Sequence, residues 1–462
     1  MRRALLPSLG IVALAAGCAV GGGVHVASRK QSVEPPRASK PRLRDVLVTV
    51  IDGDTGRRVG GARVSIAGRS GRTDRHGLAA VPIRRRAALP VTVTKARYLP
   101  RTVRLFFRRH PRSSVRIYQR RLQWPAYGVT PERTQDHDAI RLRPPFRTVW
   151  TRGLGGLIEF PAVVWEGIAY IGNARGTIHA VELRRGKIVW RYDPPGGKMA
   201  SSPAVYGDEL VVHGMDGVVR VLDRRTGRLR WRFVVGSPIE SSPVVTHDVD
   251  VFGAWNGRVY ALDLRRRRLR WTFASGYKIT SSAALAGGTV YIGDYGGRLL
   301  ALSPQSGRLR WSGRVGGRIY GTPAVAAGRV FVPSSTGGSL TAFSTGGRRL
   351  WSRHTGSYVY SSPAVWHGRV LFGSYNGLLY CVSARSGATL WTVGAGGPIS
   401  GAAVVVDGVA YAGSTWGRIT GVDVRSGRVL LRFPHGEYVP VSGNGGMLLL
   451  HGYSRLYAVR PR

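Results

Sequence analysis

Short apolar runs alternate with polar, glycine-containing segments along most of the chain, and the pattern repeats at a nearly constant interval. The repeat that starts at Pro243 contains four alternating segments, SSPVV, DVFGAW, GRVYALD and RLRWTF, separated by turn sequences. Alternation of apolar and polar residues over roughly four to eight positions is typical of half-buried β-strands. Each repeat is therefore predicted to form four short strands.

A tryptophan ends almost every repeat, at intervals of 40 or 41 residues. These residues are Trp150, Trp190, Trp231, Trp271, Trp311, Trp351 and Trp391. A period of about 40 residues with four strands per unit is typical of a β-propeller, in which sheets are arranged radially around a channel. Because the same indole recurs in unit after unit, we interpret it as a packing residue and not as a chemical one.

The repeats predict eight blades, the last of which lacks an outer strand. Innermost strands are expected at Pro161, Pro203, Pro243, Ala283, Pro323, Pro363 and Ala403, and around Val441. The segment FRTVW, which ends at Trp150, has the sequence of an outer strand but follows no blade. We expect it to complete the eighth blade, because this would close the ring and remove an exposed sheet edge.

Most blades have glycine in the turn before the outer strand, as at Gly227 and Gly307. Such a turn favours glycine because it requires a positive φ. The third blade has Arg267 at this position. Its turn is therefore expected to differ from the others.

The segments VLDRRTGRLRW (221–231) and ALDLRRRRLRW (261–271) resemble the tryptophan-docking repeat of the pyrroloquinoline-quinone-like (PQQ-like) β-propellers. The segment WPAYGVTPERT (124–134) resembles the stretch that precedes the ring in that group. The resemblance implies an all-β, eight-bladed propeller over residues 146–462, with a lead-in over 121–145. The group includes quinoprotein dehydrogenases, scaffolds of BamB type and sensor ectodomains, so the resemblance leaves function open.

Residues 44–120 contain denser alternation, with runs such as VLVTVID, ARVSIAG and TVRLFF, and predict a small antiparallel β-sandwich. The motifs DGDTGRRVGGARV (52–64), TDRHG (73–77) and KARYL (95–99) resemble the carboxypeptidase regulatory-like, transthyretin-like domain. The sequence departs from that family at Ala96, where glycine is common. The resemblance implies a noncatalytic spacer or adhesive module in front of the propeller.

Residues 1–27 carry the features of an export signal. MRR precedes an uncharged apolar stretch over 4–20, and AAGC (15–18) resembles a bacterial lipobox, which implies lipidation of Cys18. A lipoprotein signal, an uncleaved membrane anchor and a cleaved signal peptide remain alternatives. Residues 28–43 are rich in proline and basic residues and predict a spacer. We expect an extracytoplasmic protein, either membrane-anchored or secreted.

The chain has 69 lysine and arginine residues against 24 acidic ones, a formal net charge of +45. This charge indicates either a solvated basic surface or attraction to polyanions such as anionic lipid or wall polymer. No nucleic-acid-binding motif accompanies it, so no specific nucleic-acid partner is expected. Apart from Cys18 the chain contains only Cys381, in a column of small residues, where a packing role is expected.

The resemblance also raises the possibility of a quinoprotein dehydrogenase, which would need PQQ, carboxylate and amide ligands for Ca²⁺, a catalytic Asp and often a vicinal cysteine pair. The sequence has no vicinal cysteines, and Asp223 and Asp263 recur at a turn position. QDHDAI (135–140) contains Asp136, His137 and Asp138, but neighbouring residues on a strand point to opposite faces. We therefore predict no catalytic residue, cofactor or metal site.

The loops that lead into the innermost strands surround one mouth of the predicted channel, and nonrepeated residues gather there. They are Glu159, Lys198, Glu240, Lys278, Arg318, Tyr320, Tyr358, Tyr360 and Tyr438. Aromatic and cationic residues together favour a protein, peptide or anionic partner, although solvated loops with tyrosines packed between blades would give the same pattern.

The sequence thus predicts a noncatalytic, exported and membrane-tethered scaffold that contacts an unidentified protein of the cell envelope through this mouth. Two alternatives remain: a quinoprotein dehydrogenase that binds PQQ and calcium, and an envelope protein that binds polyanions.

Overall fold

The computed structural model describes residues 44–84, 88–107 and 111–462. The predicted export segment with Cys18 and the basic spacer lie outside these ranges. The described chain is all-β, apart from one 3₁₀ turn, η1 (Arg120–Leu122). No helix in the described ranges is long and apolar enough to cross a membrane.

The first strands form two sheets that share an apolar core. One sheet has the order β4-β1-β7, with β1 (Arg44–Asp52), β4 (Leu78–Ile83) and β7 (Arg112–Ile117). The other has the order β3-β2-β5-β6, with β2 (Arg63–Ile66), β3 (Arg69–Arg72), β5 (Ala88–Thr94) and β6 (Arg101–Phe106). Alternate residues such as Val46, Val48 and Val64 point into the core between the sheets.

The expectation of a purely antiparallel sandwich is wrong at one pair, because β1 and β7 run parallel. Parallel neighbours require a crossover connection, and here the chain between β1 and β7 forms β4 and the second sheet. The short strand β3 was not predicted either.

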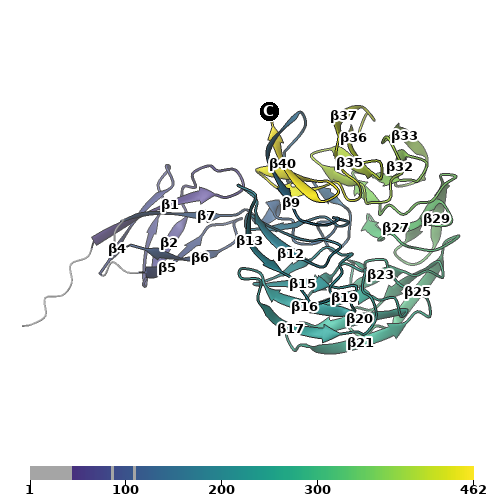
Figure 1. Cartoon of the computed structure of the whole chain (residues 1–462), viewed down its shortest axis with the longest axis horizontal. Helices are drawn as coiled ribbons and strands as arrows, with labels where there is room; N and C mark the ends of the chain where they lie inside the picture. Colours follow the sequence, from purple (N-terminus) through teal and green to yellow (C-terminus); the bar gives the residue numbers. More distant parts are fainter. Residues whose placement is uncertain (1–43, 85–87, 108–110) are drawn as a thin grey trace, which may run out of the picture. The chain divides into compact units, whose positions relative to one another are not determined.

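The remaining strands form eight sheets around a common centre, which confirms the propeller (Figure 1). Seven of these sheets have four strands, and the seventh blade has a fifth, the short strand β8 (Asp136–His137). The first blade contains β10 (Val163–Trp165), β11 (Ile168–Gly172), β12 (Ile178–Glu182) and β13 (Lys187–Tyr192), and the second contains β14 (Ala204–Tyr206), β15 (Glu209–His213), β16 (Val218–Asp223) and β17 (Leu229–Val234). The third blade contains β18 (Val244–Thr246), β19 (Val249–Gly253), β20 (Arg258–Asp263) and β21 (Arg268–Ala274), and the fourth contains β22 (Ala284–Ala286), β23 (Thr289–Gly293), β24 (Arg298–Leu302) and β25 (Leu309–Arg314).

The fifth blade contains β26 (Ala324–Ala326), β27 (Arg329–Ser334), β28 (Ser339–Ser344) and β29 (Arg349–His354). The sixth contains β30 (Ala364–Trp366), β31 (Arg369–Gly373), β32 (Leu378–Ser383) and β33 (Thr389–Gly394). The seventh contains β34 (Val404–Val406), β35 (Val409–Ser414), β36 (Arg418–Asp423) and β37 (Val429–Phe433). Within each blade consecutive strands pair antiparallel, from the innermost to the outermost.

The eighth blade joins the two ends of the propeller. It consists of β38 (Val441–Asn444), β39 (Met447–His451), β40 (Arg455–Pro461) and, from the start of the ring, β9 (Phe146–Gly153). β9 pairs antiparallel with β40, with Trp150 opposite Ala458, and the two strands lie side by side in Figure 1. The predicted closure of the ring by the FRTVW segment is confirmed.

The recurrent indoles connect neighbouring blades. Trp190 Nε1 donates a hydrogen bond of 3.1 Å to the carbonyl of Arg224 in the next blade, and equivalent bonds recur around the ring. The indole lies against the turn glycine, so that a Cβ at Gly227 would be 2.6 Å from Trp190. Glycine is therefore needed at this turn both for its positive φ and for the close approach of the indole.

The third blade breaks this pattern at Arg267. Arg267 has a positive φ of 57°, as the turn glycines of the other blades do. The expectation that this turn differs is therefore wrong for the backbone conformation. Instead, the indole N–H of Trp231, which faces this turn, is buried and has no hydrogen-bond partner among the described residues. In the other blades a Cβ at the turn glycine would meet the indole, so we attribute the unbonded Trp231 N–H to the Cβ of Arg267.

We expect Arg267→Gly to raise the free energy of unfolding by about 1 kcal/mol. Glycine removes the cost of a positive φ, roughly 1–2 kcal/mol, and allows the Trp231 N–H to bond, worth about 1 kcal/mol; greater freedom of the unfolded chain offsets part of this gain. Urea denaturation of the variant measures the change. Arg265→Gly, two positions earlier in the same turn, is the control and should be destabilising.

The lead-in segment lies inside the ring and pairs with the innermost strands of successive blades. Val164 and Trp124 exchange two backbone hydrogen bonds, and β8 (Asp136–His137) pairs parallel with β34. Between these points, the N–H groups of the inner strands donate to lead-in carbonyls at 2.8–2.9 Å: Val205 to Pro125, Leu285 to Pro131, Val325 to Glu132, Val365 to Thr134 and Val405 to Gln135. The lead-in thus fills the channel at the level of the innermost strands.

Candidate functional site

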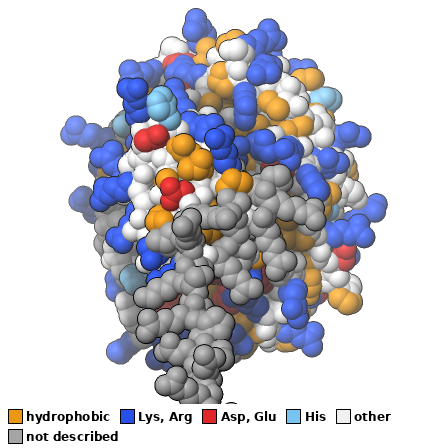
Figure 2. Space-filling model, turned by 90° about the vertical axis from the view of Figure 1, so that its left-hand side faces the viewer, with side chains coloured by type: hydrophobic (Ala, Val, Ile, Leu, Met, Phe, Trp, Pro, Cys, Tyr) orange, Lys and Arg blue, Asp and Glu red, His pale blue; other side chains and the backbone are white. Residues whose placement is uncertain are grey.

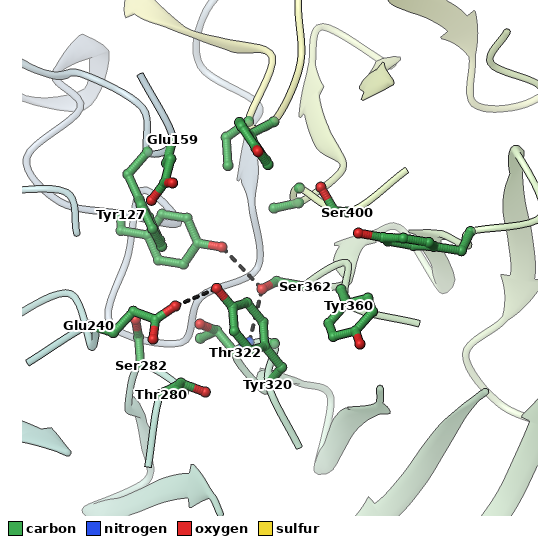
Figure 3. Close-up of a pocket in the computed structure, with 17 residues that line it drawn as sticks. Tyr127, Glu159, Glu240, Thr280, Ser282, Tyr320, Thr322, Tyr360, Ser362 and Ser400 are labelled. Carbon is green, nitrogen blue, oxygen red and sulfur yellow. Dashed lines mark hydrogen bonds between the residues drawn. The ribbon is translucent and has the colours of Figure 1, made fainter. Parts of the chain in front are cut away.

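A cavity of about 300 Å³ opens at one mouth of the channel, above the lead-in. The loops that enter the innermost strands form its wall, and Tyr127 of the lead-in contributes to it from within the channel (Figure 3). Its lining consists of Tyr127, Glu159, Phe160, Glu240, Thr280, Ser282, Tyr320, Gly321, Thr322, Tyr360, Ser362, Tyr375, Ser400, Gly401, Ala402, Tyr438 and Val439.

Hydroxyl groups connect adjacent loops at the base of this wall. The N–H of Ser242 donates to Ser282 Oγ at 2.8 Å, and the N–H of Thr322 donates to Ser362 Oγ at 2.9 Å. Tyr127 OH donates to the same Ser362 hydroxyl at 3.1 Å. These positions recur at the period of the repeat, so they belong to the blade framework that holds the loops in place.

Glu240 is a buried carboxylate with two side-chain partners. Tyr320 OH donates to Oε1, and Trp255 Nε1 donates to Oε2 at 3.1 Å. Burial raises the pKa of Glu240, while these hydrogen bonds and the charge of Lys278 oppose the shift. Burial raises the pKa of Tyr320, and the Glu240 carboxylate raises it further.

Glu159 lies in the same wall but has no side-chain hydrogen bond or ion pair within the described part of the chain. Burial raises its pKa first, and the like charges of Glu240 and Glu437 raise it further. Burial also raises the pKa of Glu437. Of the carboxyl groups of Glu159, Glu240 and Glu437, only that of Glu240 accepts side-chain hydrogen bonds from the described residues.

Tyrosine rings cover one side of the cavity. The Tyr360 centroid lies 5.5 Å from that of Tyr320, 5.9 Å from Tyr358 and 5.0 Å from Tyr375. Tyr358 and Tyr375 are about half and one-third exposed, at 50% and 37%. The cluster thus extends from the cavity to the outer surface of the mouth.

Two of the predicted cations pack on aromatic rings at the rim. Lys278 Nζ lies 3.2 Å from the centroid of the Trp255 ring and 5.1 Å from that of Tyr295. Arg318 Cζ lies 5.5 Å from the Tyr295 centroid. Each distance falls within the range of a cation–π interaction.

Of the mouth residues predicted from the sequence, Glu159, Glu240, Tyr320, Tyr360 and Tyr438 line the cavity. Lys278, Arg318 and Tyr358 lie at the rim, where they contact aromatic rings. Lys198 does not line the cavity; its backbone carbonyl accepts a hydrogen bond from Met215 at 2.8 Å.

Sequence reasoning missed several lining residues. Tyr127 belongs to the lead-in, and no local pattern placed that segment inside the ring. Tyr375 occupies the turn between the second and third strands of its blade, and this turn lies on the same face as the loops between blades because the strands alternate in direction. A search of that turn column would have found Tyr375, Trp255 and Trp416.

Exposed aromatic side chains in the described ranges concentrate on this face. Apart from Phe106 of β6, the exposed aromatic residues of the described ranges occupy such turns or the loops between blades: Trp255, Tyr277, Tyr358, Tyr375, Trp416 and Tyr453. Exposed apolar groups that gather around one opening are typical of a binding surface.

The cavity does not match the requirements of PQQ with Ca²⁺. Among the described residues, its lining contains two carboxylates and no asparagine or glutamine, whereas Ca²⁺ takes several oxygen ligands. The described cysteine, Cys381, is buried in β32, where burial raises its pKa to about 11. No group of three or more His, Cys, Asp or Glu side chains in the described ranges is arranged to hold a metal ion.

The Asp136, His137 and Asp138 side chains diverge, as expected for neighbours on a strand. His137 Nε2 lies 2.9 Å from the carbonyl of Gln123, whereas Asp138 contacts Trp366 and His367. Burial raises the pKa of Asp136 to about 8, and the charge of Asp138 adds to the shift. These residues attach the lead-in to the ring.

Comparison with known proteins supports the assignment of a β-propeller. The sequence profile of the family described as "Beta-alanine-activating enzyme, beta-propeller" matches residues 160–432. Outer membrane protein assembly factor BamB of Taylorella asinigenitalis is 35% identical over 72 residues, covering 16% of this chain and 19% of that protein. The 1-butanol dehydrogenase (cytochrome c) of Thauera butanivorans is 26% identical over 125 residues, covering 24% and 18%. The chain thus spans less than a fifth of either curated relative.

Solved structures show the same fold. BamB from Moraxella catarrhalis aligns over 69% of this chain and 98% of its own, with a TM-score of 0.58 and 20% identity. Quinohemoprotein alcohol dehydrogenase from Comamonas testosteroni aligns over 73% of this chain and 80% of its own, with a TM-score of 0.63 and 15% identity. At these identities the similarity shows that this chain shares the PQQ-like, BamB-type propeller fold, and it does not show a shared function.

Proposed function

The chain belongs to the family described as "Beta-alanine-activating enzyme, beta-propeller", and we propose that its ring is a noncatalytic platform that binds a protein partner at the aromatic mouth. In this proposal the chain is exported and tethered to the membrane, with Cys18 as the lipidation candidate. The partner is a protein of the cell envelope.

One observation carries the proposal: exposed aromatic residues gather around a cavity that is closed from within by the lead-in. Trp416 is 76% exposed and Tyr453 is 61% exposed. Large aromatic side chains are enriched at the centres of protein interfaces, and tryptophan and tyrosine contribute most to their affinity. The BamB relative, whose name states a role in outer-membrane protein assembly, gives further support.

The domain before the ring is proposed to be a carboxypeptidase regulatory-like spacer. Two of the motifs that suggest this meet in space, because Tyr98 OH donates to Asp52 Oδ2 at 2.8 Å. Asp52 Oδ1 also accepts hydrogen bonds from the N–H groups of Asp54 and Thr55, which shapes the DGDTG turn. Such contacts support a structural role for these residues.

An affinity pull-down from membranes tests the proposal. We expect Tyr358→Ser combined with Trp416→Ser to lower partner recovery about tenfold or more, because interface aromatics commonly contribute about 2 kcal/mol each. Leu229→Ser combined with Leu309→Ser is the matched control, since these residues are 42% and 46% exposed on outer strands. Equal recovery by wild type and the mouth variant would reject this surface.

A quinoprotein dehydrogenase is the second candidate, and the curated dehydrogenase relatives favour it. The lining of the cavity argues against it, because amide ligands and a cysteine pair are missing there. Spectrophotometric titration with PQQ and Ca²⁺ separates the two candidates. Stoichiometric binding with alcohol-dependent dye reduction would favour the enzyme.

Binding to anionic lipid or wall polymer is the third candidate. On the face shown in Figure 2, lysine and arginine side chains are numerous and widely spread, while acidic ones are few. Binding through such a surface would fall steeply between low and physiological salt, because the charges are exposed to screening. Failure to sediment with phosphatidylglycerol vesicles even at low salt would exclude this candidate.

A further inference from the structure

We infer that the mouth cavity binds an ammonium or guanidinium group carried on an aliphatic stem. The group is either the side chain of a lysine or arginine of the partner or the end of a free amine. The inference deepens the proposed function, since it rests on the mouth being a binding site. Four features of the cavity support it: its charge, its aromatic wall, an unbonded hydroxyl and its size.

The charged side chains that line the cavity are both acidic, although the whole chain carries a formal charge of +45. Glu240 is already bonded to Tyr320 and Trp255. Glu159 has no donor among the described residues and faces the like charges of Glu240 and Glu437. A cation beside Glu159 would replace repulsion by attraction in a partly buried site, where charges are weakly screened.

The tyrosine wall suits the same ligand. Tyr320, Tyr360 and Tyr375 pack against one another along the cavity, and aromatic faces attract ammonium and guanidinium groups. The chain itself makes this contact at the rim, where Lys278 Nζ lies 3.2 Å from the Trp255 centroid with Glu240 bonded to the same indole. The rim thus contains an internal example of a cation held by aromatic and acidic groups.

A buried hydroxyl of the cavity wall lacks a partner. Thr280 is only 5% exposed, lines the cavity, and its Oγ1 makes no hydrogen bond within the described residues. Figure 3 shows it in the wall of the cavity, together with Ser282 and Glu240, which also line it. A buried polar atom without a partner is uncommon, and a hydroxyl oxygen can accept a hydrogen bond from an ammonium or guanidinium group.

The size of the cavity sets a limit on the ligand. A volume of about 300 Å³ lies at the lower end of the range for small-molecule sites. Because the lead-in closes the channel below, the ligand must enter from the mouth and end inside the cavity. A single cationic side chain or a short amine fits these requirements.

Isothermal titration calorimetry with N-acetyl-lysine methylamide and N-acetyl-arginine methylamide tests the inference. We expect at least one of them to bind about tenfold or more tightly than the neutral N-acetyl-norleucine methylamide, because the neutral compound leaves Glu159 unpaired. Equal affinity of the charged and neutral compounds would overturn the inference.

Variants identify the site. Glu159→Gln should weaken binding of the cationic probe about tenfold, and Thr280→Val should weaken it about threefold, in line with the loss of one charged and one neutral hydrogen bond. The matched control is Glu209→Gln, because Glu209 pairs with Arg230 on an outer strand away from the mouth. Unchanged affinity for the cationic probe in both mouth variants would overturn the inference. If one variant folds poorly, unchanged affinity in the other is sufficient to overturn it.

The source of the ligand is resolved by comparing cadaverine with a pentapeptide that has one central lysine. Binding of cadaverine alone assigns a free amine, and tighter binding of the peptide assigns a partner side chain; both outcomes support the inference, and binding of neither contradicts it. If no cationic probe binds but Tyr358→Ser with Trp416→Ser still loses the partner, the inference fails and the proposed function stands.

Discussion

Arg133→Met is expected to lower the free energy of unfolding of the propeller by about 3–5 kcal/mol. Arg133 is 1% exposed, and within the described residues its guanidinium donates only to backbone carbonyls: Nε to Ala283 at 2.9 Å, Nη2 to Pro243 at 2.7 Å and Ser242 at 3.3 Å, and Nη1 to Tyr127. Methionine would leave these buried oxygens without donors, and each such loss costs about 1–3 kcal/mol.

The buried charge partly offsets this stabilisation. Burial lowers the pKa of Arg133 to about 10, while the Tyr127 and Asp250 groups oppose the shift. The variant removes that desolvation cost, so the expected loss is smaller than the sum of the broken bonds.

Chemical denaturation at neutral pH measures the effect of Arg133→Met. Arg141→Met is the matched control, because Arg141 belongs to the same lead-in but its side chain is 71% exposed in an ion pair with Asp407. Exposed pairs contribute about 0–1 kcal/mol. A loss of less than about 1 kcal/mol for Arg133→Met would contradict the role of this residue in holding the lead-in inside the ring.

Asp250→Ala is expected to cost about 3–5 kcal/mol, the second large effect. The side chains of Asp250 and His213 are both fully buried, and His213 Nε2 lies 2.8 Å from Asp250 Oδ2. His213 Nδ1 lies 2.6 Å from the carbonyl of Ser241, which requires a proton on Nδ1. Alanine would therefore leave His213 Nε2 in an apolar environment with no partner.

Asp250→Asn is the informative companion variant. The asparagine amide can donate to a neutral His213 Nε2 in nearly the same space, so we expect a loss of only about 1–2 kcal/mol. Urea denaturation of both variants measures the difference between removing the partner and replacing it. Equal losses in the two variants would show that the second and third blades depend on the Asp250 charge and not on the hydrogen bond.

Both predictions concern the framework beneath the mouth and not the mouth itself. Arg133 joins the lead-in to inner strands of the third and fourth blades, and Tyr127, whose carbonyl it bonds, contributes to the cavity lining. The shape of the cavity therefore depends on the lead-in remaining in the channel. The binding face is built on a closed ring with an occupied centre.

The sequence by itself determined the repeating part of this protein. Strand alternation, the interval between indoles and the orphan segment ending at Trp150 were sufficient to predict eight blades and the way the ring closes. This was possible because a propeller is stabilised mainly by contacts between adjacent repeats, which place the same residue type at the same position each time.

The tertiary structure decided what is not repeated. Five of the predicted mouth residues line the cavity. The inward position of Tyr127, the lack of a partner for Glu159 among the described residues and the burial of Arg133 follow from contacts between residues far apart in sequence. Arg267 shows the same limit, since its φ is that of a glycine turn and its effect falls on an indole of the preceding blade. A local pattern specifies how a strand or turn forms, whereas the neighbours of a side chain depend on how the whole ring packs.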